Sequence, residues 1–496
     1  MADAIALTNP DRRAAFLDGA LGRLGWPLAV GAVFFLQILL ILHHQPFVDE
    51  WQALQIAVQS PDFSSLIANL RYEGHPLLWY LVLRAVSDIV GPHNALMVTS
   101  LGLALTTQGL ILFRSPFPRW LRLLIALSEP ILFEYGTVSR SYTLGVMLTF
   151  WAMAAWKSRR QVWLPLALMP GVEFFFGVIS MALLLVRWGD RRIWWPGAIA
   201  WAAIGVFAAW AVIPAADFIP VYKAAPNPLQ NAVLLVLQLS IVAVPFQWGA
   251  HGPLWNSFPP FGPFLVLWIA FAALCWHQTR GRALDRVAVL GFFLVLLAFY
   301  AFYELGNRHL MLLGVLLIAL QWRRSLEGEE IRRPFVAWLA VGAACGLVTA
   351  AVSLAMPFDN ADRAVSKIRE LDLTDKHWVA ASAQHGQGIS AMSGILFQGA
   401  GQECLSDFIR WNFPRTIDDA DKLGAWSVAE SRRYGRFYLV SEVALPGAVP
   451  AVELAHIPAG YDGKAYFIYE VAPNRPDDQR KLPRCVPGMR PFPPKT

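Results

Sequence analysis

Short polar segments that interrupt long apolar runs hold the residues that could do chemistry. The first of them, Phe47-Val-Asp-Glu-Trp, places Asp49 and Glu50 directly after an apolar run. A carboxylate in such surroundings is costly and tends to mark a functional position. A short helix is expected from Asp49 to about Val58, and a second amphipathic helix around 63–72. The alternative is that both acidic residues only cap the first of these helices at its N-terminus. For an isolated Asp-Glu pair a helix cap is the better interpretation. A functional role is favoured here because further polar segments of the same kind follow along the chain.

The further segments carry carboxylates and histidines, which suit acid–base chemistry, and cations, which suit binding of an anionic group. Instead of binding an anion, an arginine at a helix end could extend its charged group to the membrane surface and only anchor the helix. Arginine is, however, uncommon in loops on the outer side of a membrane. The residues of interest are Glu73 and His75 in Glu-Gly-His-Pro, Glu134, Arg140 and Tyr142 around Val-Ser-Arg-Ser-Tyr, Glu173 in Gly-Val-Glu-Phe, Lys223, and Arg308 and His309 in Gly-Asn-Arg-His.

The composition excludes an ordinary soluble enzyme and a disordered or fibrous chain. Among 496 residues, 56% are hydrophobic and 15% are charged, against roughly 25% charged residues in an average soluble protein. The mean hydropathy is +0.44. The 41 basic and 35 acidic residues give a net charge of +6, but the basic residues lie between apolar runs, so nucleic-acid binding is not expected. The pattern predicts a polytopic α-helical membrane protein with about 11–13 transmembrane or re-entrant helices.

The apolar runs predict eleven crossings after a cytoplasmic arm at residues 1–23. The expected spans are 24–42, 94–113, 119–135, 141–156, a tight pair within 162–186, 193–214, 262–276, 287–303, 310–322 and 335–356. Five basic gaps between them should face the cytoplasm. The loops keep these sides with eleven crossings only if the segments 76–90 and 231–247 do not cross the membrane. These two segments are therefore expected to be interfacial or re-entrant. The loops that hold the polar segments, including the loop 43–75, fall on the outer side.

Residues 357–496 predict a separate small α/β domain on that same side. The segments 377–381, 435–440 and 465–471 are typical of strands, and 361–371 and 418–433 of helices. The Pro- and Arg-rich stretch 473–496 should wrap around the domain or trail from it. Cys404 and Cys485 both fall in this domain, where an oxidising compartment would let them form a disulfide. Cys275 and Cys345 lie in apolar runs as packing residues.

The order of these segments resembles the GT-C superfamily of membrane glycosyltransferases. The elements are the Asp49-Glu50 pair in the first outer loop, His75-Pro76 about 25 residues on, Ser139-Arg-Ser-Tyr after further spans, and Arg308-His309 before a late span. The branch that they most resemble holds the protein O-mannosyltransferases and the aminoarabinose transferase of lipid A. That branch often has His-Pro-Pro where this chain has His75-Pro76-Leu77, and Arg-Tyr where it has Arg308-His309. These departures leave the sugar open.

The resemblance implies an inverting transfer of a sugar from a polyprenyl-phosphate donor to a cell-envelope acceptor on the periplasmic face of a bacterial inner membrane. Asp49 matches the acidic catalytic position, with Glu50 in support, and a carboxylate is a suitable base for an acceptor hydroxyl. The lipid phosphate that leaves requires cations. The candidates for the donor phosphate are Arg308, Arg140, Lys223 and His309, and those for the acceptor or for support are Glu73, His75, Glu134, Tyr142 and Glu173.

The sequence leaves open both a metal ion and the class of function. Some members of the superfamily use a divalent metal ion, which Asp49, Glu50 and His75 could hold, although their spacing does not demand it. A polyprenyl-linked glycan flippase, a transporter or a glycan polymerase is the alternative function. A transporter would favour repeats and ionisable residues at the bilayer midplane, neither of which the sequence indicates.

Overall fold

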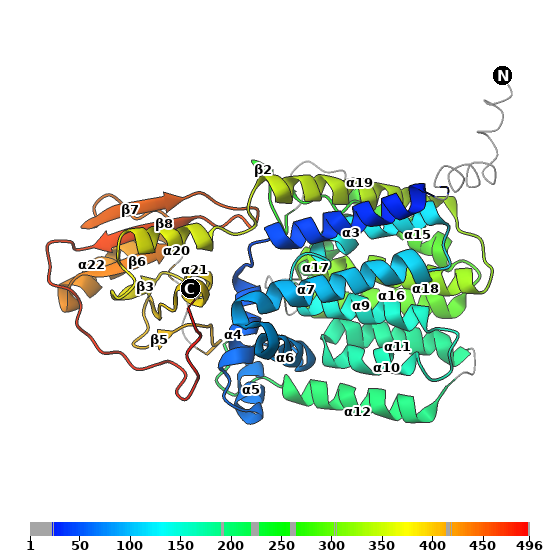
Figure 1. Cartoon of the computed structure of the whole chain (residues 1–496), viewed down its shortest axis with the longest axis horizontal. Coiled ribbons are helices and arrows are strands. Elements are labelled where there is room, and N and C mark those ends of the chain that lie inside the picture. Colours follow the sequence, from blue (N-terminus) through cyan, green and yellow to red (C-terminus); the bar gives the residue numbers. More distant parts are fainter. Residues whose placement is uncertain are drawn as a thin grey trace, which may run out of the picture. The chain divides into compact units, whose positions relative to one another are not determined.

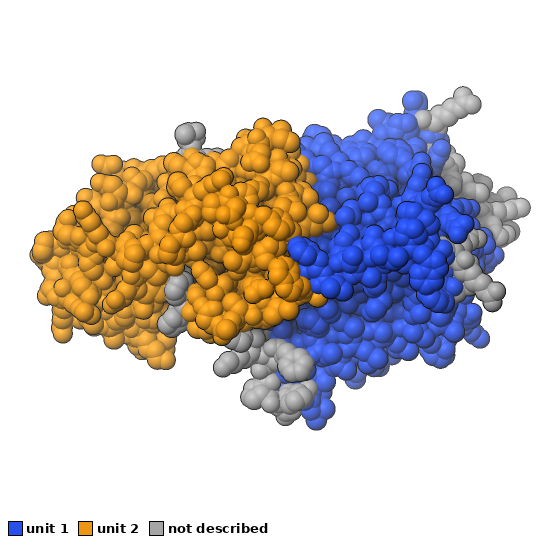
Figure 2. Space-filling model, turned by 90° about the horizontal axis from the view of Figure 1, so that it is seen from below, with its two compact units in different colours: residues 1–43, 100–208, 222–354 blue, residues 44–99, 209–221, 355–496 orange. Residues whose placement is uncertain are grey.

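A computed structural model of the chain describes residues 22, 24–189, 193–219, 228–257, 264–301, 303, 305–412, 417 and 419–494. Lys223 therefore lies outside the described residues. The chain forms two compact units (Figure 2). Unit 1 takes its residues from 1–43, 100–208 and 222–354, and unit 2 from 44–99, 209–221 and 355–496. The polar segment that contains Asp49 thus groups with the C-terminal part of the chain.

Unit 1 consists mainly of apolar helices (Figure 1). In chain order its helical elements are α3 (Gly25–His43), α7 (Pro92–Gly109), η1 (Leu110–Arg114), α8 (Arg119–Leu127), η2 (Pro130–Glu134), α9 (Ser141–Ala154), α10 (Trp163–Leu168), η3 (Met169–Gly171), α11 (Phe174–Gly189), α12 (Trp195–Ala211), α13 (Pro228–Gln238), α14 (Ser240–Ala243), α15 (Phe264–Thr279), α16 (Ala283–Tyr300), α17 (Asn307–Leu310), α18 (Leu312–Leu326) and α19 (Arg333–Ala355). A two-stranded hairpin pairs β1 (Trp248–Gly249) with β2 (Gly252–Pro253).

Four helices of the described chain are long and apolar enough to cross a membrane: α3, α7 with η1, α16 and α19. Five further apolar helices have 10–17 residues, fewer than the roughly 20 that a perpendicular crossing needs. The fold class expected from the sequence, a helical membrane protein with a C-terminal α/β part, is confirmed by these helices and by the sheet described below.

The run 119–135, expected as one span, is two helical pieces instead. Ser128 is extended, with ψ at 142°, and Pro130 occupies the first turn of η2. Proline is tolerated there because the first N–H groups of a helix have no intrahelical partner. Ser128-Glu129-Pro130 interrupts the apolar run at the break, but apolar residues on both sides keep the mean hydropathy of the whole run high.

Buried glutamines hold this break together. The Gln108 amide donates to Ala126 O at 3.1 Å and to Gln37 Oε1 at 3.1 Å, and the Gln37 amide donates to Leu132 O at 3.1 Å. In an apolar body every freed carbonyl group needs such an internal partner. Helix α19 closes over the break at Gly346, where a Cβ atom would lie 2.1 Å from the Leu127 carbonyl oxygen.

Unit 2 contains a six-stranded mixed sheet in the order β5-β4-β3-β6-β8-β7, in which β3 pairs in parallel with β4 and β6 and the other pairs are antiparallel. Its C-terminal elements are α20 (Ala361–Glu370), β3 (Trp378–Ala380), α21 (Ala383–Ser393), β4 (Phe397–Gly399), β5 (Leu405–Ser406), α22 (Ala420–Tyr434), β6 (Phe437–Ser441), β7 (Ala451–Ile457) and β8 (Tyr466–Val471). The expected helices and strands of this part are confirmed, whereas α21, β4, β5 and β7 were not predicted.

Helices cover both faces of this sheet. Val379 and Leu439 point to one face, where they share a core with Leu423 of α22. Because side chains alternate along a strand, the neighbouring Ala380 points to the other face, where it lies under α21 at Gly386. Unit 2 is therefore a three-layer α/β structure.

The N-terminal part of unit 2 consists of α4 (Val48–Gln59), α5 (Phe63–Leu70) and α6 (Leu78–Val90). The first two agree with the short helices expected between residues 49 and 72. Helix α4 packs on α21, where Gly388 leaves space for Trp51 and for Ala361 of α20; a Cβ at Gly388 would lie 2.9 Å from the Ala361 Cβ. This close packing connects the first polar segment to the sheet.

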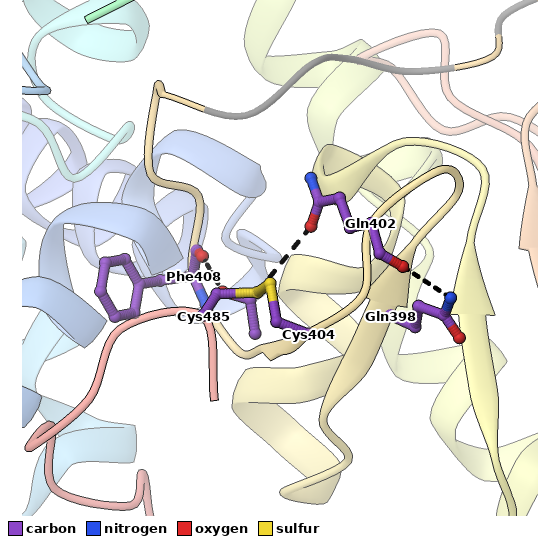
Figure 3. The surroundings of a disulfide bond; sticks show 6 residues. Gln398, Gln402, Cys404, Phe408 and Cys485 are labelled. Carbon is purple, nitrogen blue, oxygen red and sulfur yellow. Dashed lines mark hydrogen bonds between the residues drawn. A yellow bond between two sulfur atoms is a disulfide. The ribbon is translucent and has the colours of Figure 1, made fainter. Parts of the chain in front are cut away.

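A disulfide joins Cys404 and Cys485, with Cα atoms 4.9 Å apart and a sequence separation of 81 residues (Figure 3). It lies where the last stretch of the chain runs beside β5, with Leu405 N donating to Pro483 O at 2.9 Å. Farther on, Arg490 N donates to Gln59 O of α4 at 2.9 Å. The stretch after residue 473 thus wraps around unit 2. Of the two expected alternatives, wrapping and trailing, the structure shows wrapping.

Two carboxylates lie side by side where α20 begins: Asp359 is buried and Asp462 is partly buried. Asp462 N donates to Phe358 O at 2.9 Å, which sets Asp462 beside Asp359, and Asp359 accepts the Tyr466 hydroxyl at 2.7 Å. Burial raises the pKa of Asp359, and burial together with the Asp359 carboxylate raises the pKa of Asp462 well above its usual range. The Lys464 ammonium opposes this rise at both carboxyl groups.

We predict that this pair makes the protein less stable as pH rises. A carboxyl group whose pKa is higher in the folded state gives its full stabilisation below the unfolded pKa of about 4, and this is lost as pH rises through the folded value. The apparent unfolding temperature should therefore fall between pH 4.5 and pH 8, and Asp462→Asn should flatten that slope.

Asp477→Asn is the control, because the hydrogen bond from Arg436 lowers the pKa of Asp477. Its stabilisation is lost only at lower pH, so the slope above pH 5 should stay as in the parent. A slope for Asp462→Asn that matches the parent would contradict the assignment.

Candidate functional site

The described residues of unit 1 bring four sequence-distant segments to one buried polar cluster, here called the arginine cluster: Glu129, Glu134, Tyr135, Arg140, Tyr142, Glu173, Gln247, Trp255, Arg308 and His309. Residues 131–146, which run from η2 through a loop into α9, are all buried. Irregular backbone inside a membrane protein is tolerated where it is buried in protein or lines a cavity. The loop 135–140 is such a segment.

Two carboxylates of the broken span share a donor. The Gln247 amide donates to Glu129 Oε1 at 3.0 Å and, weakly, to Glu134 Oε2 at 3.5 Å. Glu134 Oε2 also accepts the Trp255 indole N–H at 2.8 Å. Both carboxylates are at most 3% exposed. Buried acids of this kind need such donors and nearby cations, because unpaired buried charge is strongly unfavourable.

Asn256 fixes the loop that carries Trp255. Its backbone is left-handed, with φ at 58°, a conformation that asparagine adopts more readily than most residues. Asn256 N donates to Gln247 Oε1 at 2.6 Å, and its side-chain oxygen accepts Asn307 N at 2.9 Å. One residue thereby ties the Gln247 segment to the start of α17, which carries Arg308.

Arg308 and Arg140 supply the positive charge. The Arg308 guanidinium lies over the Trp255 ring, 5.2 Å from its centroid, and the Arg308 carbonyl oxygen accepts the Tyr135 hydroxyl. Both arginines act electrostatically on Glu134 and on the Tyr142 hydroxyl. Two cations thus act on the Glu134 carboxylate in the protein body.

Tyr142 lies at the centre of an aromatic group. Its ring stacks on Tyr135 with centroids 6.0 Å apart and meets the His309 ring edge-on at 5.7 Å. Tyr142 is 2% exposed, and its hydroxyl group finds no hydrogen-bond partner among the described residues. A buried hydroxyl left in this state is unfavourable, so the position is suited to a polar group that a substrate brings.

The Glu173 side chain accepts a hydrogen bond at the N-terminus of α11. Its Oε1 accepts the backbone N–H of Phe174 at 3.1 Å, and Oε2 accepts the Ser141 hydroxyl at 3.4 Å. A carboxylate at a helix N-terminus is stabilised by the unpaired N–H groups there. Glu173 is therefore a helix cap that also contacts the residue before Tyr142.

In unit 2, Asp49 and Glu50 stand in the first turn of α4, but their environments differ. Glu50 is fully buried; its Oε2 accepts the backbone N–H of Phe47 at 3.0 Å, as in a capping box, and faces His44 Nε2 at 2.8 Å. Asp49 is partly exposed. The Glu50 carboxylate thus accepts a hydrogen bond at the start of α4, whereas the Asp49 side chain is partly accessible to solvent.

Glu73 also belongs to unit 2, where it accepts the Gln52 amide at 2.7 Å. His75 is partly exposed. The described residues contain no group of three or more His, Cys, Asp or Glu side chains placed to hold a metal ion. The Glu50 oxygen that faces His44 also accepts the Phe47 N–H at the helix start.

Sequence reasoning missed Glu129, Gln247, Trp255 and Tyr135 as members of the arginine cluster. Glu129 carried a signal, since an acidic residue before a proline interrupts an apolar run. Gln247 and Trp255 carried no such sequence signal, because they lie more than 110 residues from the carboxylates to which they donate hydrogen bonds. Of the expected donor-side residues, the structure gathers Arg140, Arg308 and His309. Tyr142, Glu134 and Glu173, which the sequence assigned to the acceptor or to support, lie in the same cluster.

No family model matches the chain, and no curated protein matches it. Solved structures that it resembles include two crystal structures of ArnT from Cupriavidus metallidurans, one bound to undecaprenyl phosphate and one in the apo state. The first is 12% identical with a TM-score of 0.45, and the match covers 91% of this chain and 99% of that one. The second is 12% identical with a TM-score of 0.47, covering 90% and 98%. At such identity the likeness assigns no residue roles.

Proposed function

We propose that this protein is an inverting glycosyltransferase that moves a sugar from a polyprenyl-phosphate donor to a cell-envelope acceptor, on the periplasmic face of a bacterial inner membrane. The observation that supports it most is the arginine cluster: two arginines and an unsatisfied tyrosine hydroxyl inside an apolar helical body. A lipid-linked phosphate is an anion that arrives from the membrane, and such a site would receive it. The order of the polar segments along the chain supports the reaction class.

Arg308 and Arg140 bind the donor phosphate in this proposal. When the glycosidic bond breaks, negative charge develops on the phosphate, and cations held in a water-poor site stabilise it strongly. Glu134 keeps the arginines in place before the donor binds, and the Trp255 ring supports the Arg308 guanidinium. Tyr142 donates its hydroxyl group to a phosphate oxygen.

Asp49 is the base in this proposal. It accepts the proton of the acceptor hydroxyl while that oxygen attacks the anomeric carbon from the face opposite the phosphate, which gives inversion. Glu50 acts as a positioning residue, since it fixes the first turn of α4 from which Asp49 projects.

For Arg308 we predict that Ala lowers transfer more than Lys does. A lysine still meets a phosphate as a point charge, whereas the bidentate geometry of the guanidinium is lost. Transfer of radiolabelled sugar at varied donor concentration should show the larger rise in donor KM for Arg308→Ala. Arg286→Ala is the matched control, because Arg286 also lies over a tryptophan ring, 4.1 Å from the Trp276 centroid, outside the arginine cluster. If both Arg308 variants kept nearly the parent activity, Arg308 would only anchor the end of its helix and would not bind the donor.

For Tyr142 we predict that Phe lowers kcat by about 10- to 100-fold, the worth of a hydrogen bond to a charged group. The fold should not suffer, because the hydroxyl has no partner among the described residues. Tyr135→Phe is the comparison, since its hydroxyl binds the Arg308 carbonyl oxygen and its loss should lower the unfolding temperature. Full activity of Tyr142→Phe would exclude a hydroxyl contact with the substrate.

For Asp49 we predict that Asn lowers the rate by about 10²–10⁴, the usual contribution of general acid–base catalysis. Asparagine caps helices about as well as aspartate, so yield and donor binding should be retained. Asp62→Asn is the matched control, because Asp62 caps α5 by accepting Ser65 N at 2.8 Å. If Asp49→Asn turns over like Asp62→Asn, Asp49 is only a cap and the assignment fails.

A further inference from the structure

Helix α18 is buried along almost its whole length. Residues 312–324 are all buried, and most of them are aliphatic. Helix α17, which carries Arg308, leads directly into α18: Met311 between the two helices has helical backbone angles, and its N–H donates to Asn307 O at 3.0 Å. Arg308 and the far end of α18 therefore belong to one helical segment. A shift of α18 along its axis would carry Arg308 with it.

Aliphatic packing alone specifies the axial position of such a helix poorly. The run 312–320, Leu-Leu-Gly-Val-Leu-Leu-Ile-Ala-Leu, places aliphatic side chains on every side of the helix. A shift by one turn, about 5.4 Å, would exchange most of these side chains for others of similar shape. Polar contacts at the ends of α18 are therefore the features that distinguish one axial position from the next.

One such contact is a buried ion pair at the end of α18 that lies opposite Arg308. It joins Arg323 of α18 to Asp285 in the first turn of α16. The Arg323 Nη2 atom lies 3.2 Å from Asp285 Oδ1 and donates to Asp285 Oδ2 at 3.4 Å. Arg323 is 3% exposed and Asp285 is 1% exposed. The two helices are thus joined by charge inside the protein body.

Stability does not explain this ion pair. The Arg323 Nε and Asp285 Oδ1 atoms are buried and make no hydrogen bond to the described residues. A buried ion pair repays the cost of removing its charges from water only when its hydrogen bonds are nearly complete, and apolar residues of similar volume often stabilise a protein as well or better. The best-attested use of such a polar contact is to fix the register of two packed helices.

Two features near the ion pair do not replace it. A carboxylate in the first turn of a helix is stabilised by the free N–H groups there, but that role of Asp285 needs neither burial nor Arg323. A second ion pair joins the same helix ends, with Arg282 Nη2 at 2.7 Å from Glu327 Oε2, but its side chains are 37% and 32% exposed. Exposed ion pairs contribute little, so this second pair is a suitable control.

We propose that the Asp285–Arg323 ion pair fixes the axial position of α17 and α18 and thereby holds Arg308 where it meets the donor phosphate. Asp285 and Arg323 are positioning residues, since neither belongs to the arginine cluster. The proposal rests on the proposed function, which it deepens by assigning control of the donor site to the opposite end of α18.

The test removes both charges together, in the double variant Asp285→Leu with Arg323→Leu. No unpaired charge remains, so the unfolding temperature should equal or exceed that of the parent. In the transfer of radiolabelled sugar, kcat/KM for the donor should fall by about 10- to 100-fold, the cost of a misplacement of about 1 Å, while the KM for the acceptor stays as in the parent. Asp285→Asn with Arg323→Met is a second double variant that should give the same changes.

Arg282→Leu with Glu327→Leu is the matched control. It removes one positive and one negative charge from the same two helix ends, but from the exposed ion pair. Its kcat/KM for the donor should stay near that of the parent. An equal loss in the control and in the Asp285→Leu/Arg323→Leu variant would contradict the proposal, because the buried pair would then have no special role.

Pulsed electron paramagnetic resonance measures the axial position of α18 without assuming any activity. Spin labels are attached to the full-length protein at Leu294→Cys on α16 and Ser325→Cys near the end of α18, with Cys275 and Cys345 replaced by alanine. In the Asp285→Leu/Arg323→Leu variant the distance between the labels should shift, by up to the roughly 5 Å of one turn, or its distribution should broaden. In the control variant it should stay as in the parent.

Equal distance distributions in the parent and the Asp285→Leu/Arg323→Leu variant would overturn the proposal, whatever the transfer assays show. A changed distance with a parent-like kcat/KM for the donor would also overturn it, since the position of α18 would then not control the donor site. If the parent itself transfers no sugar, the proposed function fails and the role at the donor site fails with it, while the distance measurement still decides whether the ion pair fixes α18.

Discussion

A helix that breaks inside an apolar body must have its freed backbone groups satisfied by the protein itself, because no water is available to do so. In this chain the break at Ser128 meets that constraint through Gln108 and Gln37, which donate to Ala126 O and Leu132 O. Gly346 allows α19 to close against the break. Replacing Gln108 by an apolar residue would remove the side-chain donor to Ala126 O, whereas Leu132 O would still accept the Thr137 hydroxyl at 2.9 Å if Gln37 were replaced. The glutamine hydrogen bonds connect α3, α7, α8 and η2 at the break.

The break also explains why unit 1 can hold charge. A continuous helix over 119–135 would place Glu129 and Glu134 on a regular surface, whereas the extended Ser128 and the turn of η2 direct both toward Gln247. The loop that follows carries Arg140 and Tyr142 into the same buried region. Charge, hydrogen-bond donors and an unsatisfied hydroxyl are thereby gathered in a water-poor environment, where electrostatic interactions are strongest.

Much of the fold follows from patterns that sequence shows directly, and the rest depends on contacts between distant segments. The short helices of the first polar segment and the strands around residues 378, 437 and 466 agreed with the structure because their periodicity and caps are local. Helix α21 was missed because its two glycines disfavour a helix; their purpose, close packing against Phe397 and Ala361, is visible only in three dimensions. The pairing of Gln247 with Glu129 spans 118 residues and leaves no local trace. Roles for Asp49 and Arg308 came from motif order, and their chemistry stays a prediction.

The central claim is that the chain transfers sugar from a lipid phosphate. The most direct measurement incubates the purified protein with a polyprenyl phosphate that carries a radiolabelled sugar, together with envelope extract as acceptor, and separates free polyprenyl phosphate from intact donor. The account predicts one free polyprenyl phosphate for each sugar that enters the acceptor fraction, with inverted anomeric configuration. Donor that stays intact, whether left in place or moved across the bilayer, would contradict it and favour a flippase or a transporter.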